Sequence, residues 1–113
     1  ALNQDKPFDA FVREQLAGDE MVPQPHKNLS PEAVEKIAAT GFLRMAADGT
    51  GAMNDNAARN ATIADTIKII GSALYGLTLD CAQCHDHRYD PISQADYYRM
   101  RAIFEPGFDT KSW

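Results

Sequence analysis

The sequence predicts an all-α fold, a small bundle of about four helices joined by long loops. Apolar residues in the longest segment recur at steps of three and four, which is the spacing of one helix face. Proline, serine and glycine stand where helices are expected to begin and end. No segment alternates apolar and polar residues convincingly enough to predict a strand.

Two helices are predicted in the N-terminal part of the chain. The stretch DKPFDAFVREQLAGD has Asp5 as a possible cap, Pro7 in the first turn and Gly18 at the end. The stretch SPEAVEKIAATG begins with Ser30 as its N-cap and ends at Gly41, for which a left-handed conformation is expected. The prolines between the two stretches predict an extended connection.

The third helix is predicted over about residues 55–77. Its apolar face consists of Ile63, Ile67, Ile70, Leu74 and Leu77. The fourth helix is predicted to begin at Ser93, because Ser93 and Asp96 have the spacing of a capping box. It is expected to end before Pro106.

Length and composition limit the protein classes to which the chain can belong. Its 113 residues are 44% hydrophobic and 24% charged, which is typical of one globular domain over residues 1–113. The net charge of -5 disfavours a nucleic-acid partner, and no apolar run approaches the roughly 20 residues of a membrane span. Because the chain opens ALNQDKPFDAF, without an initiator methionine, we expect a segment of a longer protein.

Both cysteines lie in one motif, Cys81-Ala-Gln-Cys84-His85. Covalent attachment of haem needs two sulfurs spaced to reach two vinyl groups, with a histidine next to the second sulfur. The motif meets both requirements. It predicts one haem c, attached through Cys81 and Cys84 and ligated by His85, at the centre of the helical bundle. Arg88, three residues further on, is a candidate partner for a haem propionate.

Two other sites could use the same residues. A redox dithiol or disulfide needs only Cys81 and Cys84, but it normally lies at a helix start within a strand–helix pattern. Zinc could take both cysteines together with His85 and His87, although four ligands within seven residues would be cramped. A structural module held by a disulfide or by zinc is therefore a third interpretation.

The sequence leaves the sixth iron ligand open. His87 follows His85 too closely to reach the opposite face of the iron. Met53 and Met45 are the main candidates, because the loop and the helix end that carry them could approach from a distance. The further candidates are Met21, His26 and Met100. Without a sixth protein ligand, the domain would be a five-coordinate haem enzyme or a sensor of peroxide or a diatomic gas.

Several stretches resemble the planctomycete-type cytochrome domain of large exported bacterial proteins. They are DKPFDAFVREQLAGD, IAATGFLRM, ARNATIADTIKI and GLTLDCAQCHDHRYDPISQADYYRMRAIFEP, which together cover nearly the whole chain. The resemblance implies that Cys81, Cys84 and His85 bind haem, and that the domain works in the periplasm or outside the cell. One departure is Asp80, where a small residue is expected.

Together the residues and the resemblance predict a c-type cytochrome domain that carries single electrons. Its expected partners are redox proteins or other haem domains of the same parent chain. The haem enzyme or sensor and the structural module are the alternatives, so whether the chain is an enzyme is left open.

Overall fold

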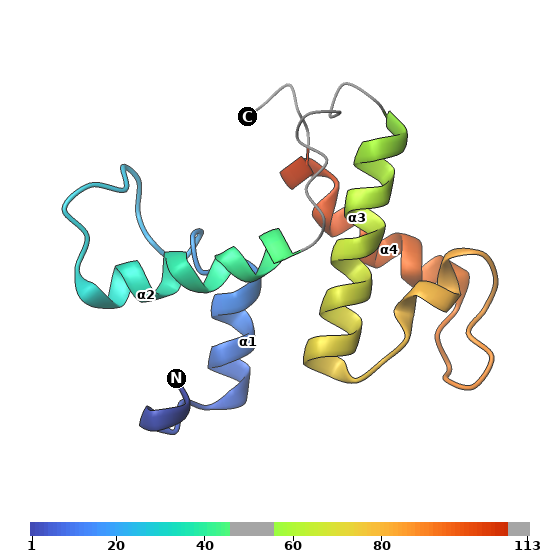
Figure 1. The fold of residues 1–113 in the computed structure, drawn as a ribbon, viewed down its shortest axis with the longest axis horizontal. Helices are drawn as coiled ribbons and strands as arrows, with labels where there is room; N and C mark the ends of the chain where they lie inside the picture. The colour runs from blue at the N-terminus through green and yellow to red at the C-terminus, as the bar shows by residue number, and fades with distance from the viewer. Residues whose placement is uncertain (46–55, 109–113) are drawn as a thin grey trace. The chain divides into compact units, whose positions relative to one another are not determined.

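The computed structural model describes residues 1–45 and 56–108 (Figure 1). These residues form four α-helices and several shorter helical turns, with no strand among them. The predicted all-α class is therefore confirmed for the described residues. The chain divides into two compact units, Ala1–Met45 (unit 1) and Ala46–Trp113 (unit 2), which are described separately. That both units form one haem domain stays a prediction.

Unit 1 contains a pair of helices with a short 3₁₀ turn at either end. Its elements are η1 (Leu2–Gln4), α1 (Phe8–Ala17), α2 (Pro31–Thr40) and η2 (Gly41–Met45). The Oγ of Ser30 accepts a hydrogen bond from the amide of Ala33 at 3.2 Å. The predicted N-cap of α2 is therefore confirmed.

Two predicted helix ends in unit 1 are wrong. Asp5 does not cap α1; it ends η1 in a left-handed conformation with φ of 49°, and Pro7 is the N-cap of α1. Gly41 is right-handed, with φ of -56°, instead of left-handed. The reason is the same at both places: a 3₁₀ turn lies beside the α-helix, and local residue preferences do not reveal it.

The helices of unit 1 approach each other closely at Gly18. This residue is buried, and a Cβ added there would overlap the backbone carbonyl oxygen of Lys36 in α2. Only glycine fits, although the backbone at this position is right-handed. An ion pair of 2.5 Å between Lys6 and Glu14 joins the segment before α1 to the helix itself.

Unit 2 is built around one long helix. Its elements are α3 (Asn56–Ile70), the π turn η4 (Gly71–Tyr75), the 3₁₀ turn η5 (Leu79–Gln83), α4 (Gln94–Phe104) and η6 (Pro106–Phe108). In Figure 1, α4 crosses behind α3, and the two helices are in contact. The third helix is thus shorter than predicted, because the chain reverses at Gly76, which is left-handed with φ of 66°.

The core of unit 2 lies between α3, η5 and α4. Its buried members are Ile63, Ile67, Leu79, Ala82, Tyr97 and Phe108. Ile63, Ile67 and Ile70 are fully buried, which confirms that part of the predicted face. Leu74 and Leu77 remain partly exposed, because the π turn breaks the helical spacing before they are reached.

Gly71 positions the turn that carries the motif. A Cβ added to Gly71 would lie 2.7 Å from Cγ of Leu79, so Leu79 packs directly on the glycine. At the other end of α3, Arg59 donates hydrogen bonds to the carbonyls of Phe108 at 2.9 Å and Glu105 at 2.8 Å. Both ends of α3 therefore contact other elements of unit 2: Gly71 contacts η5, and Arg59 binds the end of α4 and η6.

Candidate functional site

The motif lies on the short turn η5 and its C-cap. Leu79 and Ala82 are buried and anchor the turn in the core, whereas Cys81 and Cys84 are exposed free thiols. Cys81 lies within the turn and Cys84 is its C-cap, so the fold leaves both thiols accessible three residues apart.

His85 is exposed and has a defined tautomer. Its Nδ1 is 2.7 Å from the backbone carbonyl oxygen of Asp86. Because a carbonyl oxygen only accepts, this hydrogen bond requires the proton on Nδ1, and the neutral form of this ring has its lone pair on Nε2. No hydrogen bond to Nε2 is found within residues 1–45 and 56–108. A lone pair on one nitrogen and a backbone acceptor on the other is the state in which histidine binds metals.

His87 is engaged at both ring nitrogens, in contrast to His85. Its Nδ1 accepts hydrogen bonds from the amides of Tyr89 at 3.2 Å and Asp90 at 2.9 Å. The proton therefore lies on Nε2, which donates to Oγ1 of Thr78 at 2.8 Å. The side chain is 3% exposed. His87 is therefore a hydrogen-bonded residue of the loop.

The zinc site considered for the motif is not assembled among the described residues. No group of three or more His, Cys, Asp or Glu side chains in this part of the chain lies close enough together to hold a metal ion. A His87 that uses both nitrogens in hydrogen bonds fits this finding.

The N-terminus of α4 is tied to the motif through Asp86. The predicted capping box is confirmed: Ser93 Oγ accepts from the amide of Asp96, and Oδ2 of Asp96 accepts from the amide of Ser93, both at 3.1 Å. In addition, Oδ1 of Asp86 accepts from the amide of Gln94 at 2.8 Å. One residue thus binds His85 through its carbonyl and α4 through its carboxylate.

A second connection joins α4 to the turn itself. The carbonyl of Gln83 accepts hydrogen bonds from the side-chain amide of Gln94 at 3.1 Å and from the hydroxyl of Tyr98 at 3.3 Å. Sequence reasoning missed these contacts and the one between Asp86 and Gln94. The partners are 8 to 15 residues apart and follow no local spacing rule.

A buried hydroxyl lies in the core next to these elements. The Oη of Tyr97 has no hydrogen-bond partner in the described ranges. Burial is the main cause that raises the pKa of Tyr97, while the charge of Arg101 opposes it. Tyr98, Asp80 and Cys84 add smaller increases to this pKa. The hydroxyl is thus a hydrogen-bond donor for which the described residues supply no acceptor.

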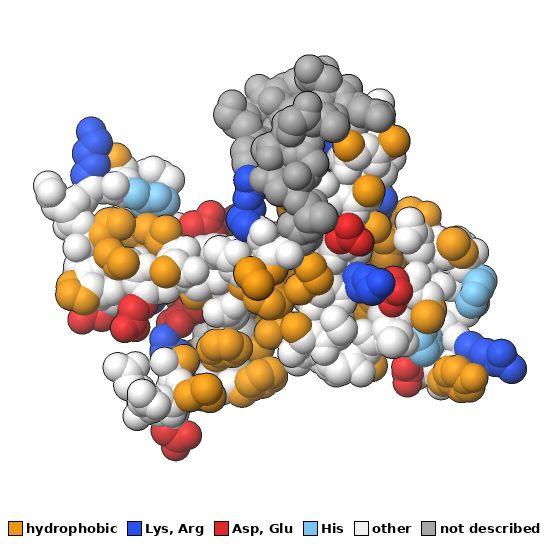
Figure 2. Space-filling view, in the orientation of Figure 1, with side chains coloured by type: hydrophobic (Ala, Val, Ile, Leu, Met, Phe, Trp, Pro, Cys, Tyr) orange, Lys and Arg blue, Asp and Glu red, His pale blue; other side chains and the backbone are white. Residues whose placement is uncertain are grey.

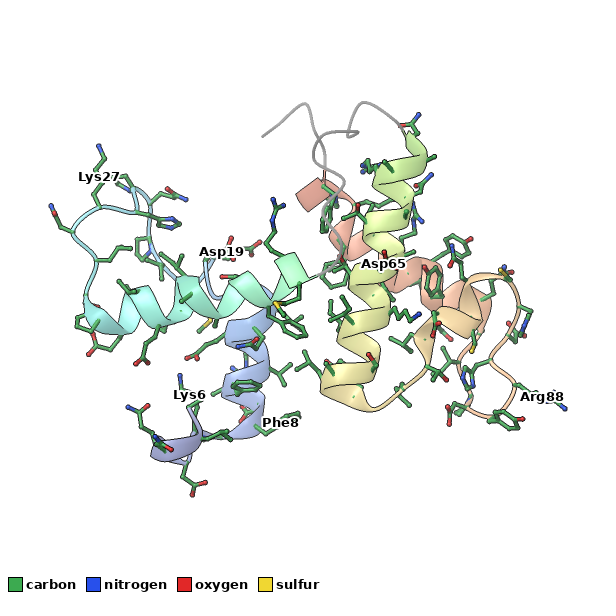
Figure 3. The ribbon with its side chains drawn as sticks, viewed as in Figure 1. Lys6, Phe8, Asp19, Lys27, Asp65 and Arg88 are labelled. Carbon is green, nitrogen blue, oxygen red and sulfur yellow. The ribbon has the colours of Figure 1, made fainter. Side chains whose placement is uncertain are left out.

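Arg88 lies at the tip of the loop after η5. Figure 3 shows its side chain pointing outward, and its guanidinium is 5.6 Å from the ring centre of Tyr89, which is a cation–π contact. Figure 2 shows that this edge of unit 2 carries histidine, basic and hydrophobic surface. Its role as a propionate partner stays a prediction.

The remaining candidates lie in different parts of the chain. Met53 lies outside the described residues. Met45 is 73% exposed at the end of η2 and belongs to unit 1, whereas Met100 packs against the core of unit 2. The sixth ligand therefore stays a prediction. Asp80, the departure from the expected pattern, pairs with Lys68 of α3 at 3.8 Å.

Comparison with known proteins identifies a family for nearly the whole chain. The family model PSCyt2, described as a protein of unknown function (DUF1549), matches residues 1–107. No curated protein and no solved structure gave a significant match. Among the described helices, none is long and apolar enough to cross a membrane.

Proposed function

Since the chain belongs to the PSCyt2 family, as its resemblance to the planctomycete-type cytochrome domain predicts, we propose that it is a c-type haem domain that carries single electrons. One observation carries this proposal: two exposed free thiols, three residues apart on η5 and its C-cap, are followed directly by an imidazole whose Nε2 is unoccupied by hydrogen bonds in the described residues.

The donor set fits covalent haem. Cys81 and Cys84 are both free, so each thiol can add across one vinyl group, with sulfur bonding to one carbon and hydrogen to its neighbour. This addition needs no oxidant. His85 would hold the iron through Nε2. Bound haem would supply one-electron chemistry, while the two tethers would prevent its loss outside the cell.

Residues beside the motif could cover part of an apolar cofactor. Tyr98 is hydrogen-bonded to the carbonyl of Gln83, and the residue is about half exposed. The unpartnered hydroxyl of Tyr97 is a second group that an acceptor on a bound ligand could satisfy.

The proposed compartment is the periplasm or the cell exterior, and the proposed partners are redox proteins or other haem domains of the parent chain. The net charge of -5 favours partners with a basic surface. Electron exchange with such a partner should slow as salt is added, because salt screens the attraction.

The first experiment tests for haem. The protein is produced in an export compartment with the haem-attachment machinery, its oxidised and reduced absorption spectra are recorded, and a denaturing gel is stained for haem. We expect covalent haem with low-spin bands. High-spin bands with rapid carbon monoxide binding would contradict electron transfer and favour the haem enzyme or sensor. A colourless protein would contradict the haem proposal and favour the structural module.

The second experiment tests the attachment residues. Cys84→Ala leaves one thiol, so we expect at most one thioether and weaker haem retention on the denaturing gel. Cys81→Ala combined with Cys84→Ala should abolish covalent retention. Val34→Ala, at an exposed position of α2 in unit 1, is the control and should retain haem like the parent. Equal retention in Cys84→Ala and the parent would contradict the assignment.

A further inference from the structure

We infer that His87 is a positioning residue, whose imidazole closes the segment from Thr78 to Asp90 and holds the motif in place before haem arrives. The part of this inference that concerns haem rests on the proposed function. The closure of the loop itself does not.

The imidazole joins the two ends of the segment that carries the motif. Nε2 donates to Thr78, immediately before η5, and Nδ1 accepts from the amides of Tyr89 and Asp90, beyond the motif. Thr78 also begins the turn, since its carbonyl accepts from the amide of Cys81 at 3.2 Å. One side chain therefore fixes the start of the turn and the loop that follows it.

The backbone of His87 is fastened to the same loop. Its amide donates to the carbonyl of Ile92 at 2.8 Å, and the amide of Ile92 donates to Asp90 at 2.7 Å. Ile92 packs against the core of unit 2. The closed segment is thereby anchored to the core through a residue outside the motif.

Among the described residues, these contacts make His85, and not His87, the histidine that can bind a metal without losing a hydrogen bond at Nε2. A metal at Nδ1 of His87 would displace the hydrogen bonds from Tyr89 and Asp90, and a metal at Nε2 would displace the one to Thr78. His85 has no such commitment at Nε2 in the described residues. A loop closed in advance has already lost the entropy that ligand binding would otherwise remove, so the motif is preorganised.

The first test uses protein that cannot attach haem. In a Cys81→Ala and Cys84→Ala background, hydrogen exchange at the amides of Tyr89 and Asp90 is measured by NMR. Adding His87→Leu should speed this exchange about tenfold or more, since the acceptor is lost. His87→Asn should restore part of the protection, because its side-chain oxygen can accept.

The controls separate the loop from general loss of structure. The amide of Val34, which donates within α2, should exchange at the parent rate in every variant, and His26→Leu should leave Tyr89 and Asp90 unchanged. If His87→Leu does not fold, the nearly isosteric Thr78→Val is used as the test variant in its place. It removes the hydroxyl that accepts from Nε2 of His87. Unchanged exchange at Tyr89 and Asp90 in the variant that folds would overturn the inference.

The second test uses haem-loaded protein. His87→Leu should lower the ratio of doubly to singly attached haem by about tenfold or more and give more than one low-spin signal in electron paramagnetic resonance, because the orientation of His85 is less fixed. His87→Asn should restore a single signal. A parent without haem would defeat the proposed function alone, since the exchange result would stand. A haem-loaded parent with neither readout changed by His87→Leu would defeat the inference.

Discussion

The two units of the chain are stabilised in different ways. Unit 2 buries a cluster of large side chains, whereas among the described residues of unit 1 only Gly18 and Val22 are buried. Large apolar side chains of unit 1 stay exposed, namely Leu2, Phe8, Met21, Val34 and Met45. Unit 2 therefore depends on apolar burial, and unit 1 depends on a close approach of two backbones at Gly18.

The comparison explains why the candidate site lies in unit 2. Leu79 and Ala82 belong to the turn that carries both cysteines, and they are also members of the core. The contacts that stabilise the unit are thus the contacts that position the thiols. A site held by packed side chains on a rigid turn is suited to attaching a rigid cofactor.

The largest expected effect separates the two units by core truncation. Ile67→Ala removes a fully buried side chain and should lower the free energy of unfolding of unit 2 by about 2–5 kcal/mol. Val34→Ala, at a position that is 49% exposed in α2, should change stability by about 0.5 kcal/mol or less. Urea unfolding, followed by hydrogen exchange at α3 and α2, measures both. Equal costs would show that unit 2 has no dominant core.

A smaller effect is expected from the helix contact of unit 1. Gly18→Ala places a Cβ against the backbone oxygens of Lys36 and Glu14, which cannot move freely, so a loss of about 1–3 kcal/mol is expected. Gly41→Ala is the matched control, since it is right-handed and has open space around it. It should be neutral or slightly stabilising. If both variants melt alike, the close approach of α1 and α2 is not what holds unit 1.

Capping residues and apolar spacing predicted the helices well, but they could not predict contacts between residues far apart in the sequence. Ser30 and Ser93 act within their own first turns, so their caps could be read from the sequence. Leu79 packs against Gly71 at the start of the π turn, and no pattern in either stretch reveals that contact. The change from α-helix to π turn after Ile70 was therefore not predicted, although the helical residues continue to Tyr75, near the predicted end.

The candidate site shows the same division. Cys81, Cys84 and His85 could be predicted as a candidate site because haem attachment requires this spacing, which is a property of consecutive residues. The bond between His87 and Thr78 links residues nine apart across a turn. Only the fold reveals this bond. It also shows that His87 uses both ring nitrogens in hydrogen bonds, whereas His85 is exposed.

The smallest expected effect compares acid sensitivity at the two helix caps. The hydroxyl of Ser93, followed by its amide and by Arg99, lowers the pKa of Asp96 in the folded state. Ionised Asp96 therefore stabilises α4 fully above about pH 4, the ordinary value of an aspartate, and this contribution is lost as the pH falls through the lowered pKa. In unit 1, the pKa of Glu32 is lowered by its own backbone amide and then by Ser30.

Each cap should act on its own helix. Asp96→Asn cannot ionise, so it should reduce the loss of hydrogen-exchange protection in α4 between pH 5 and pH 2 and leave α2 unchanged, in the window where carboxylates titrate. Glu32→Gln should do the reverse. The measurement is amide exchange in both helices over this pH range, corrected for the intrinsic pH dependence of exchange. A change of equal size in α2 and α4 on Asp96→Asn would mean that the two units share one acid transition, and the contrast between them would not extend to their stability.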